Sequence, residues 1–216
     1  MVEPVFHSAT WYEATDGLSF ADYLAARPAE LRGTWRRKRR RIERESGFAA
    51  SFHDRPAGLE AAIADYEAVH EASWKPPEGF PGFIPALIRL AAAEGALRLG
   101  IYRLAGRPVA AQFWIVWNRR AVVYKLAHDA RLDALSPGTL LTMEMFERVL
   151  DRDRPAEITF GRGDDAYKKL WLPRRRERWG IRASNPRTPR GLAEGLERAA
   201  AKLYHRLRGG PTAPPR

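Results

Sequence analysis

Residues 122–171 read VVYKLAHDARLDALSPGTLLTMEMFERVLDRDRPAEITFGRGDDAYKKLW, and this stretch decides the fold. It contains a strand, a loop, a helix that starts at Ser136-Pro137-Gly138, a second strand, and a short helix entered through residues 161–165. Two strands joined by a helix of this length predict a βαβ unit with parallel strands and a right-handed crossover. Ligands of such units bind beyond the carboxyl ends of the strands. His128 and Asp129 end the first strand, so the polar residues gather at that edge.

The rest of the chain predicts further helices and strands around this unit. Ser19 caps a helix that runs to about Ser46, with an interruption at Pro28. Residues 1–17 show no clear period and are expected to cover an exposed core edge. A charged strand over residues 174–184 is expected to turn Trp179 and Ile181 inward. The remaining predicted elements are a strand at Phe48–His53, helices at Gly58–Trp74 and Phe83–Glu94, a three-strand meander at residues 97–104, 109–117 and 121–127, and a helix at Gly191–Leu207. This order predicts one mixed α/β layer with helices on both faces.

Composition excludes several kinds of site. The 216 residues include no cysteine, so there is no disulfide, thiolate metal ligand or thiol nucleophile. The five histidines are widely separated, and no metal site is predicted. No apolar run is long enough to span a bilayer, and the N-terminus lacks the features of a signal peptide, so a cytoplasmic location is expected.

The net charge of +11 is concentrated in two places. Residues 32–44 contain eight basic and one acidic residue, and residues 174–190 contain seven basic and one acidic residue. Either segment suits a polyanionic partner such as tRNA, and either is equally explained as a solvated surface. The candidate contacts in the first segment are Arg36, Arg37, Lys38, Arg39, Arg40 and Arg41.

The helix that starts at Ser136 has the properties of an anion site. Its first amides lack intrahelical acceptors, and the positive end of the helix dipole favours a phosphate. Gly138 allows close approach of the backbone, whereas Ser136 either caps the helix or contacts the ligand. An ordinary Ser-Pro-Gly helix start without a ligand is the alternative.

The meander VAAQFWIVWNRRAVVYKLAHD, the helix LSPGTLLTMEMFERVL and the end motif ITFGRGDDAYKKLW together resemble the GNAT acyltransferase superfamily. The resemblance is nearest to the CelD-like acetyltransferases, which are related to the Fem aminoacyl transferases, and covers about Ser19 to Asn185. It implies a GNAT-like mixed central sheet over residues 47–185, preceded by an N-terminal segment and basic helix (1–46) and followed by a C-terminal helix and disordered tail (186–216). Members with two such domains in tandem are common, and this chain resembles the second.

The resemblance also implies where the donor binds. The donor would be acetyl-CoA or another acyl-CoA, with no metal. The residues expected to bind it are Ala127, Asp129, Ser136, Gly138, Thr139, Leu140 and Lys168. The loop 127–138 lacks the spaced glycines of the superfamily's pyrophosphate signature, which leaves aminoacyl-tRNA open as the donor.

Acyl transfer to an amine needs a base for the amine and an acid for the leaving group, but no covalent nucleophile. His128 is the candidate base, because its ordinary pKa is near 6.5. Tyr167 occupies the position at which the superfamily often has a tyrosine acid. Asp164 is a third catalytic candidate, and its simpler interpretation is an N-cap for a helix over 165–172. Trp74 and Phe80 are guessed to form an acceptor-side wall, with ordinary packing as the alternative.

The sequence is therefore consistent with three functions. The first is acyl transfer from acyl-CoA to an amine or hydroxyl acceptor, for which the CelD-like resemblance suggests an envelope or polysaccharide precursor. The second is a Fem-like transfer from aminoacyl-tRNA. The third is a non-catalytic basic module that binds nucleic acid or another anion.

Overall fold

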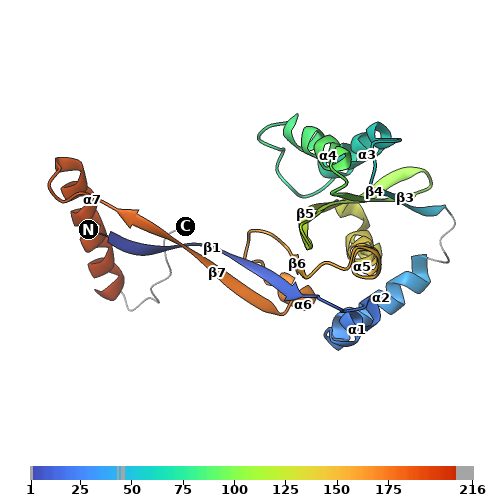
Figure 1. Ribbon diagram of the computed structural model, residues 1–216, viewed down its shortest axis with the longest axis horizontal. Coiled ribbons are helices and arrows are strands. Elements are labelled where there is room, and N and C mark those ends of the chain that lie inside the picture. The colour runs from blue at the N-terminus through green and yellow to red at the C-terminus, as the bar shows by residue number, and fades with distance from the viewer. Residues whose placement is uncertain (1, 43, 45–46, 208–216) are drawn as a thin grey trace. The chain divides into compact units, whose positions relative to one another are not determined.

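The computed structural model describes residues 2–42, 44 and 47–207 (Figure 1). Contacts divide the chain into two units, which are described separately. The sheet unit comprises residues 11–161 and 165–174, and the terminal unit comprises the remaining described residues. The predicted helix end near Ser46 and the predicted tail after residue 208 lie outside the described residues. The predicted boundaries at 46/47 and 185/186 stay a prediction.

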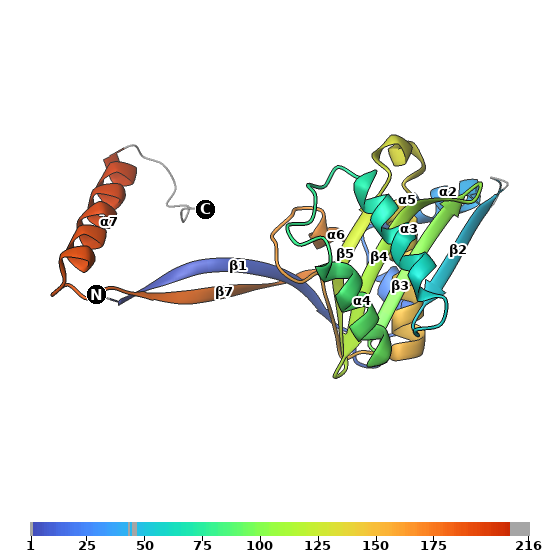
Figure 2. The same cartoon turned by 90° about the horizontal axis from the view of Figure 1, so that it is seen from above.

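The strands are β1 (Val2–Ala14), β2 (Phe48–His53), β3 (Leu97–Leu104), β4 (Arg107–Trp117), β5 (Arg120–His128), β6 (Glu157–Thr159) and β7 (Arg174–Ala183). Their order is β2-β3-β4-β5-β6-β1-β7. Strands β2 to β5 form an antiparallel meander, and β6 pairs parallel to β5. The predicted βαβ unit and the mixed sheet are therefore confirmed (Figure 2).

The helices are α1 (Phe20–Ala25), α2 (Ala29–Ile42), α3 (Leu59–Glu71), α4 (Phe83–Ala93), α5 (Pro137–Arg148), α6 (Lys168–Trp171) and α7 (Pro189–Leu207). A 3-10 helix, η1 (Ala130–Leu135), precedes α5, and a π-helical turn, η2 (Val149–Asp153), follows it. The predicted cap is present, because the Ser19 side chain accepts a hydrogen bond from Asp22 N–H at 3.2 Å. Pro28 separates α1 from α2, as its missing amide requires.

Each face of the sheet is covered by helices and has its own core. On one face, α3 and α4 pack over alternating strand residues such as Leu99, Ile101 and Phe113. On the other, α1, α2 and α5 pack over Tyr102, Trp114 and their neighbours (Figure 1). Because strand side chains alternate between faces, the apolar meander supplies both cores.

The N-terminal segment differs from its prediction, because residues 2–14 form a strand. Tyr12 pairs with Thr159 and Ala14 with Glu157, so the end of this segment joins the sheet beside β6, and Trp11 packs against one core. Its apolar residues follow no period of two, and the sequence pattern therefore contains no strand signal.

The terminal unit contains the outer half of β1, most of β7, and α7. β7 confirms the predicted charged strand, but the inward orientation of its apolar residues is wrong. Trp179 is 59% exposed and Ile181 79% exposed. Trp179 instead contacts the edge of Phe6, with ring centroids 5.7 Å apart. Nearly all residues of β7 are exposed, so its alternation does not separate an inward from an outward face. In the described part of the chain, no helix is both long and apolar enough to cross a bilayer.

Candidate active site

Strands β5 and β6 separate soon after they begin to pair. Arg120, Ala121 and Val122 pair with Glu157, Ile158 and Thr159, and the described chain shows no further pairs between them. Phe160 N–H donates to Trp11 O at 3.1 Å, so the chain after β6 follows β1. We call residues 123–128 of β5, beyond the last pair, the β5–β6 fork.

Two features of β5 shape this fork. The β4–β5 register shifts between the pairs Phe113–Lys125 and Trp114–Val123, which leaves Tyr124 as an extra residue in β5. Such a bulge bends the strand away from regular pairing. Asp129 N–H donates to Val109 O. Since backbone direction alternates along a strand, Ala127 faces β4, whereas the polar backbone groups of His128 face the fork.

The N-terminus of α5 lies beside the end of β5. Ser136 adopts a left-handed conformation (φ 55°), and its hydroxyl donates to Asp133 O at 3.2 Å without capping the helix. Leu140 N–H donates to Ser136 O, and Pro137 has no N–H. The first-turn amides without an intrahelical acceptor are therefore those of Gly138 and Thr139.

Buried Gln112 holds this helix start against β4. Its Nε2 donates to Gly138 O at 3.2 Å and to the Thr142 hydroxyl, and its Oε1 accepts from Trp114 Nε1 at 2.9 Å. A buried polar side chain with all its groups bonded fixes its neighbours. The free amides of the α5 start are therefore held in place before any ligand arrives.

His128 lies directly against Gly138. A Cβ added to Gly138 would meet His128 Nδ1 at 2.7 Å, so any other residue here would displace the His128 ring or the start of α5. His128 Nε2 is 2.7 Å from Asp133 Oδ1, and its ring is 4.6 Å from that of Trp74. When Nε2–H is donated to Asp133, the lone pair of the neutral ring is on Nδ1, the nitrogen that lies beside Gly138.

Asp129 and Leu140 are placed as structural residues. The Asp129 side chain is buried and accepts from Arg131 N, Nε and Nη2, and from Arg107 Nη2. The hydrogen bonds from Arg131 lower the pKa of Asp129 to about 2 against the opposing effect of burial. Its carboxylate shapes the loop before α5. Leu140 and Ala127 are also buried, and their backbone N–H groups are turned to Ser136 O and to β4, so their predicted contact with a donor stays a prediction.

Tyr167 and Lys168 come together at the start of α6. Tyr167 is 44% exposed and contacts the edge of Phe160 at 6.0 Å between ring centroids. Partial burial and then the Asp165 charge raise the pKa of Tyr167 to about 12, which keeps the phenol protonated. Lys168 is buried, with Nζ 2.8 Å from Asp165 Oδ2.

Asp164 belongs to the terminal unit, where Arg175 Nη2 donates to its carboxylate at 2.7 Å. The predicted N-cap role is wrong, because α6 begins at Lys168 and Tyr167 is its N-cap residue. Helix α6 is shorter than predicted, and the Asp164 carboxylate, which was expected to cap it, accepts from Arg175 instead.

Sequence reasoning missed two lysines in the sheet unit. Burial first, and then the charges of Lys125 and Lys168, lower the pKa of Lys75. Lys125 Nζ lies 2.7 Å from Glu78 Oε1. The only sequence signal for Lys75 was its position next to Trp74, which faces His128. Phe80 is 80% exposed, and its role in an acceptor wall stays a prediction.

No group of three or more His, Asp or Glu side chains in the described residues could hold a metal ion. The mixed sheet with a fork next to a helix start is an acyltransferase architecture, and the comparisons identify the family.

Residues 29–169 match the model of the acetyltransferase (GNAT) domain family, and the chain belongs to this family. A comparison with curated proteins finds no match. Similar solved structures include the C-terminal domain (DUF2156) of a putative lysylphosphatidylglycerol synthetase from Agrobacterium fabrum, with TM-score 0.56, 13% identity, and coverage of 83% of this chain and 61% of that one. L-PGS from Bacillus licheniformis is similar with TM-score 0.55 and 12% identity, and the match covers 83% of this chain and 60% of that one. FemX is similar with TM-score 0.58 and 10% identity, and the match covers 82% of this chain and 60% of that one.

These identities show a shared fold alone. The chain spans about three-fifths of the length of these structures. The predicted GNAT resemblance and fold class are confirmed, and family and fold support acyl transfer in general. The CelD-like assignment stays a prediction.

Proposed function

We propose that the protein transfers an acyl group from acyl-CoA to an amine at the β5–β6 fork. The observation that carries this proposal is the pair of first-turn amides, Gly138 and Thr139, held beside a strand whose outer edge is unpaired beyond Val122. The amides suit the pyrophosphate of coenzyme A, and the free β5 edge suits the amide-bearing arm of the same molecule. Ser136 and Lys168 supply further polar contacts to the donor.

The chemistry assigns one proton to each of two residues. The amine nitrogen attacks the thioester carbonyl carbon, and the bond from that carbon to sulfur breaks. His128 takes the proton from the amine, directly or through water, and Tyr167 gives its proton to the leaving thiolate. Trp74 and Lys75 lie on the acceptor side, where an acceptor with an anionic group, such as an envelope precursor, meets the lysine. Asp164 as a catalytic group stays a prediction.

Thermal unfolding with acetyl-CoA tests donor binding. A ligand at about 100 times its dissociation constant stabilises the folded state by about 2.7 kcal/mol, and we expect a shift of that order. Tyr167→Phe should bind the donor normally but turn over at least about a hundredfold more slowly with an amine acceptor. Absence of a shift with acetyl and longer acyl donors contradicts the proposal, and full turnover by Tyr167→Phe removes this residue as the acid.

A second candidate, transfer from aminoacyl-tRNA, is favoured by the exposed face of α2. Arg36, Arg37, Arg40, Arg41 and Arg44 line an open hollow of about 710 Å³. Lys38 is turned away and donates to Ala134 O. Four guanidinium groups of α2, with that of Arg44 beyond its end, are suited to successive phosphates.

Salt titration of RNA binding tests this candidate. For single strands, the logarithm of affinity should fall by about 0.7 per phosphate contact for each log unit of salt. Replacing Arg36, Arg37 and Arg40 by Gln should reduce that slope by about two units. A slope unchanged by the triple variant contradicts tRNA binding by α2. RNA binding without any effect of acyl donors favours the non-catalytic basic module.

A further inference from the structure

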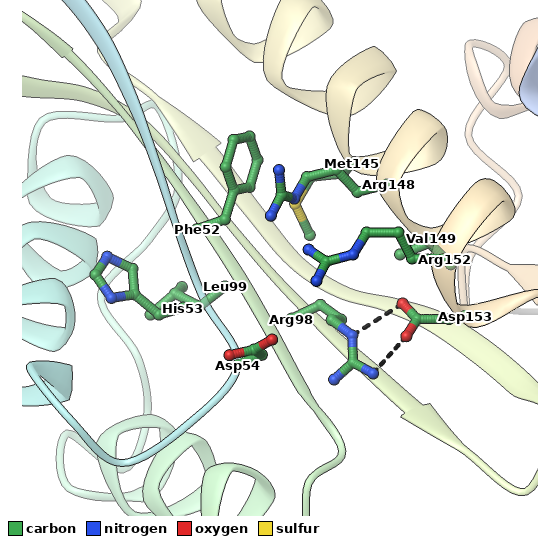
Figure 3. Close-up of a pocket in the computed structure, with 10 residues that line it drawn as sticks. All are labelled: Phe52, His53, Asp54, Arg98, Leu99, Met145, Arg148, Val149, Arg152 and Asp153. Atoms are coloured by element: carbon green, nitrogen blue, oxygen red, sulfur yellow. Dashed lines mark hydrogen bonds and ion pairs between the residues drawn. The ribbon is translucent and has the colours of Figure 1, made fainter.

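The sheet unit contains a cavity of about 260 Å³ at the opposite end of α5 from the fork (Figure 3). It lies between the end of β2, the start of β3, the last turn of α5, and η2. Along α5, the lining residues Met145 and Arg148 come seven and ten residues after Gly138, so the cavity lies about 10 to 15 Å from the Gly138 amide, since a helix rises 1.5 Å per residue. A ligand in this cavity therefore does not occupy the proposed donor site.

Three arginine side chains point into this cavity, and they differ in their partners (Figure 3). Arg98 is fixed by Asp153, with Nε to Oδ2 at 2.9 Å and Nη2 to Oδ1 at 2.5 Å. Arg148 lies over the Phe52 ring, 4.0 Å from its centroid. Across the described residues, neither Arg148 nor Arg152 has a carboxylate within ion-pair distance.

The charges of Arg148 and Arg152 repel each other. Burial lowers the pKa of Arg148 and the charge of Arg152 lowers it further, whereas the charges of Asp54, Glu144 and Asp153 act in the opposite direction. Two cations that point toward one space gain most from an anion bound between them, because guanidinium forks match the oxygens of a phosphate.

A local irregularity of the helix places these groups. Arg154 N–H donates to Val149 O at 3.0 Å, which closes the π-helical turn of η2. Such turns cost stability and are frequent at functional sites. Here the wider turn carries both Arg152 and Asp153 on the cavity wall.

The floor of the cavity is apolar, whereas the wall at the end of β2 carries the polar residues His53 and Asp54. Met145, Leu99 and Val149 are buried and form the floor. Asp54, whose side chain is 46% exposed, faces the arginines from the β2 side (Figure 3). A carboxylate at this place repels a bare anion but accepts hydrogen bonds from a hydroxyl group.

We propose that this cavity binds a small soluble phosphorylated polyol, with its phosphate between Arg148 and Arg152 and a hydroxyl group on Asp54. The volume of about 260 Å³ suits a compound of a few carbons. The apolar floor packs against the carbon atoms, and Arg98 is held by Asp153 as a fixed wall.

Isothermal titration calorimetry with glycerol 3-phosphate, inorganic phosphate and glycerol tests the proposal. We expect glycerol 3-phosphate to bind most tightly and glycerol not to bind. Arg148→Gln and Arg152→Gln should each weaken glycerol 3-phosphate binding at least about tenfold. Arg154→Gln is the matched control. It removes the same charge two residues after Arg152, but the Arg154 side chain does not line the cavity. It should change the affinity for glycerol 3-phosphate less than about twofold.

Asp54→Asn separates the role of the carboxylate from that of the arginines. It should strengthen binding of inorganic phosphate and reduce the preference for glycerol 3-phosphate over phosphate. Unchanged affinity in both cavity variants, or equal losses in Arg154→Gln, overturns the proposal, since binding is then to the basic surface in general. Binding to phosphatidic acid vesicles but not to glycerol 3-phosphate overturns the soluble ligand.

Circular dichroism and thermal unfolding of each variant confirm that it is folded before its affinity is compared. Because the cavity is remote from Gly138, acetyl-CoA binding should survive in Arg148→Gln and Arg152→Gln. Failure of the polyol proposal therefore leaves the acyltransferase proposal standing.

Discussion

Gly138 is the residue at which fold and proposed chemistry meet. A methyl group at this position would overlap His128 Nδ1 and displace either the ring or the start of α5. We expect Gly138→Ala to weaken acetyl-CoA binding at least about tenfold, because the free amides and the base both move. Gly82→Ala is the matched control, since a methyl group there meets nothing within 4 Å and should leave affinity unchanged. Equal affinities of Gly138→Ala and the parent, measured by calorimetry, contradict the site.

Asp129 links the loop before α5 to pH. Its pKa is lowered from 3.8 to about 2 in the folded protein, so the ionised carboxylate stabilises the fold above pH 3.8. That stabilisation is lost as the pH falls from about 4 through 2. We expect Asp129→Asn to unfold at a lower temperature at neutral pH, and the difference from the parent to shrink across this window. A difference that stays constant from pH 6 to pH 2 would show that the carboxylate charge contributes nothing.

At the scale of elements, α5 packs closely on β3 at Gly100, where no side chain intervenes. A Cβ there would lie 2.8 Å from Met145 Sδ and 3.0 Å from Leu141 Cδ1. Gly100→Ala should lower the free energy of unfolding by about 1–3 kcal/mol through overpacking. Gly33 lies in α2, where an added Cβ meets nothing within 4 Å. Gly33→Ala should therefore raise the free energy of unfolding by about 0.4–1 kcal/mol by restricting the unfolded chain. Urea unfolding of both variants measures the contrast, and a neutral Gly100→Ala would mean that α5 moves freely against the sheet.

Elements with a clear period were predictable from sequence, and those shaped by distant partners were not. The Ser136-Pro137-Gly138 start and the meander follow local rules, so they were found. The sequence of β1 shows no alternation of apolar and polar residues. Its strand conformation depends on pairing with β6, which is distant in the sequence. Within the site, His128 and Gly138 were placed at one edge by the βαβ rule. Lys75 was missed because only the folded chain brings it near Lys125 and Lys168.

For the whole molecule, segments outside the family match complete the core of the matched part. The match covers residues 29–169. Tyr23 stacks on Phe146 at 4.6 Å between ring centroids, and Trp171 stacks on Phe146 at 5.7 Å. The Tyr23 hydroxyl donates to Trp171 O at 3.0 Å. The flanking segments of the sheet unit are therefore part of the folded domain, and removal of residues 11–28 should expose Phe146.

Arg27 joins β1, α1 and the end of α6 through hydrogen bonds, and its replacement tests this arrangement. It is 6% exposed and donates to Tyr23 O at 3.2 Å, Trp171 O at 2.5 Å and Glu13 Oε2 at 2.8 Å. Arg27→Met removes the donor to the Glu13 carboxylate and to Tyr23 O, whereas Trp171 O keeps the Tyr23 hydroxyl. The free energy of unfolding should therefore fall by about 3–5 kcal/mol. Adding Glu13→Gln should cost less than the sum of the single changes, because the two residues share one interaction.

The exposed pair Arg89–Glu60 is the control for Arg27, since it has comparable geometry, with Nη2 to Oε2 at 2.6 Å, but both side chains face solvent. Arg89→Met should cost less than about 1 kcal/mol in the same urea titration. If Arg27→Met costs no more than Arg89→Met, the flanking segments do not depend on this arginine. Such a result would leave the β1–β6 pairs and the aromatic stack on Phe146 as the contacts that join residues 11–28 to the acyltransferase domain.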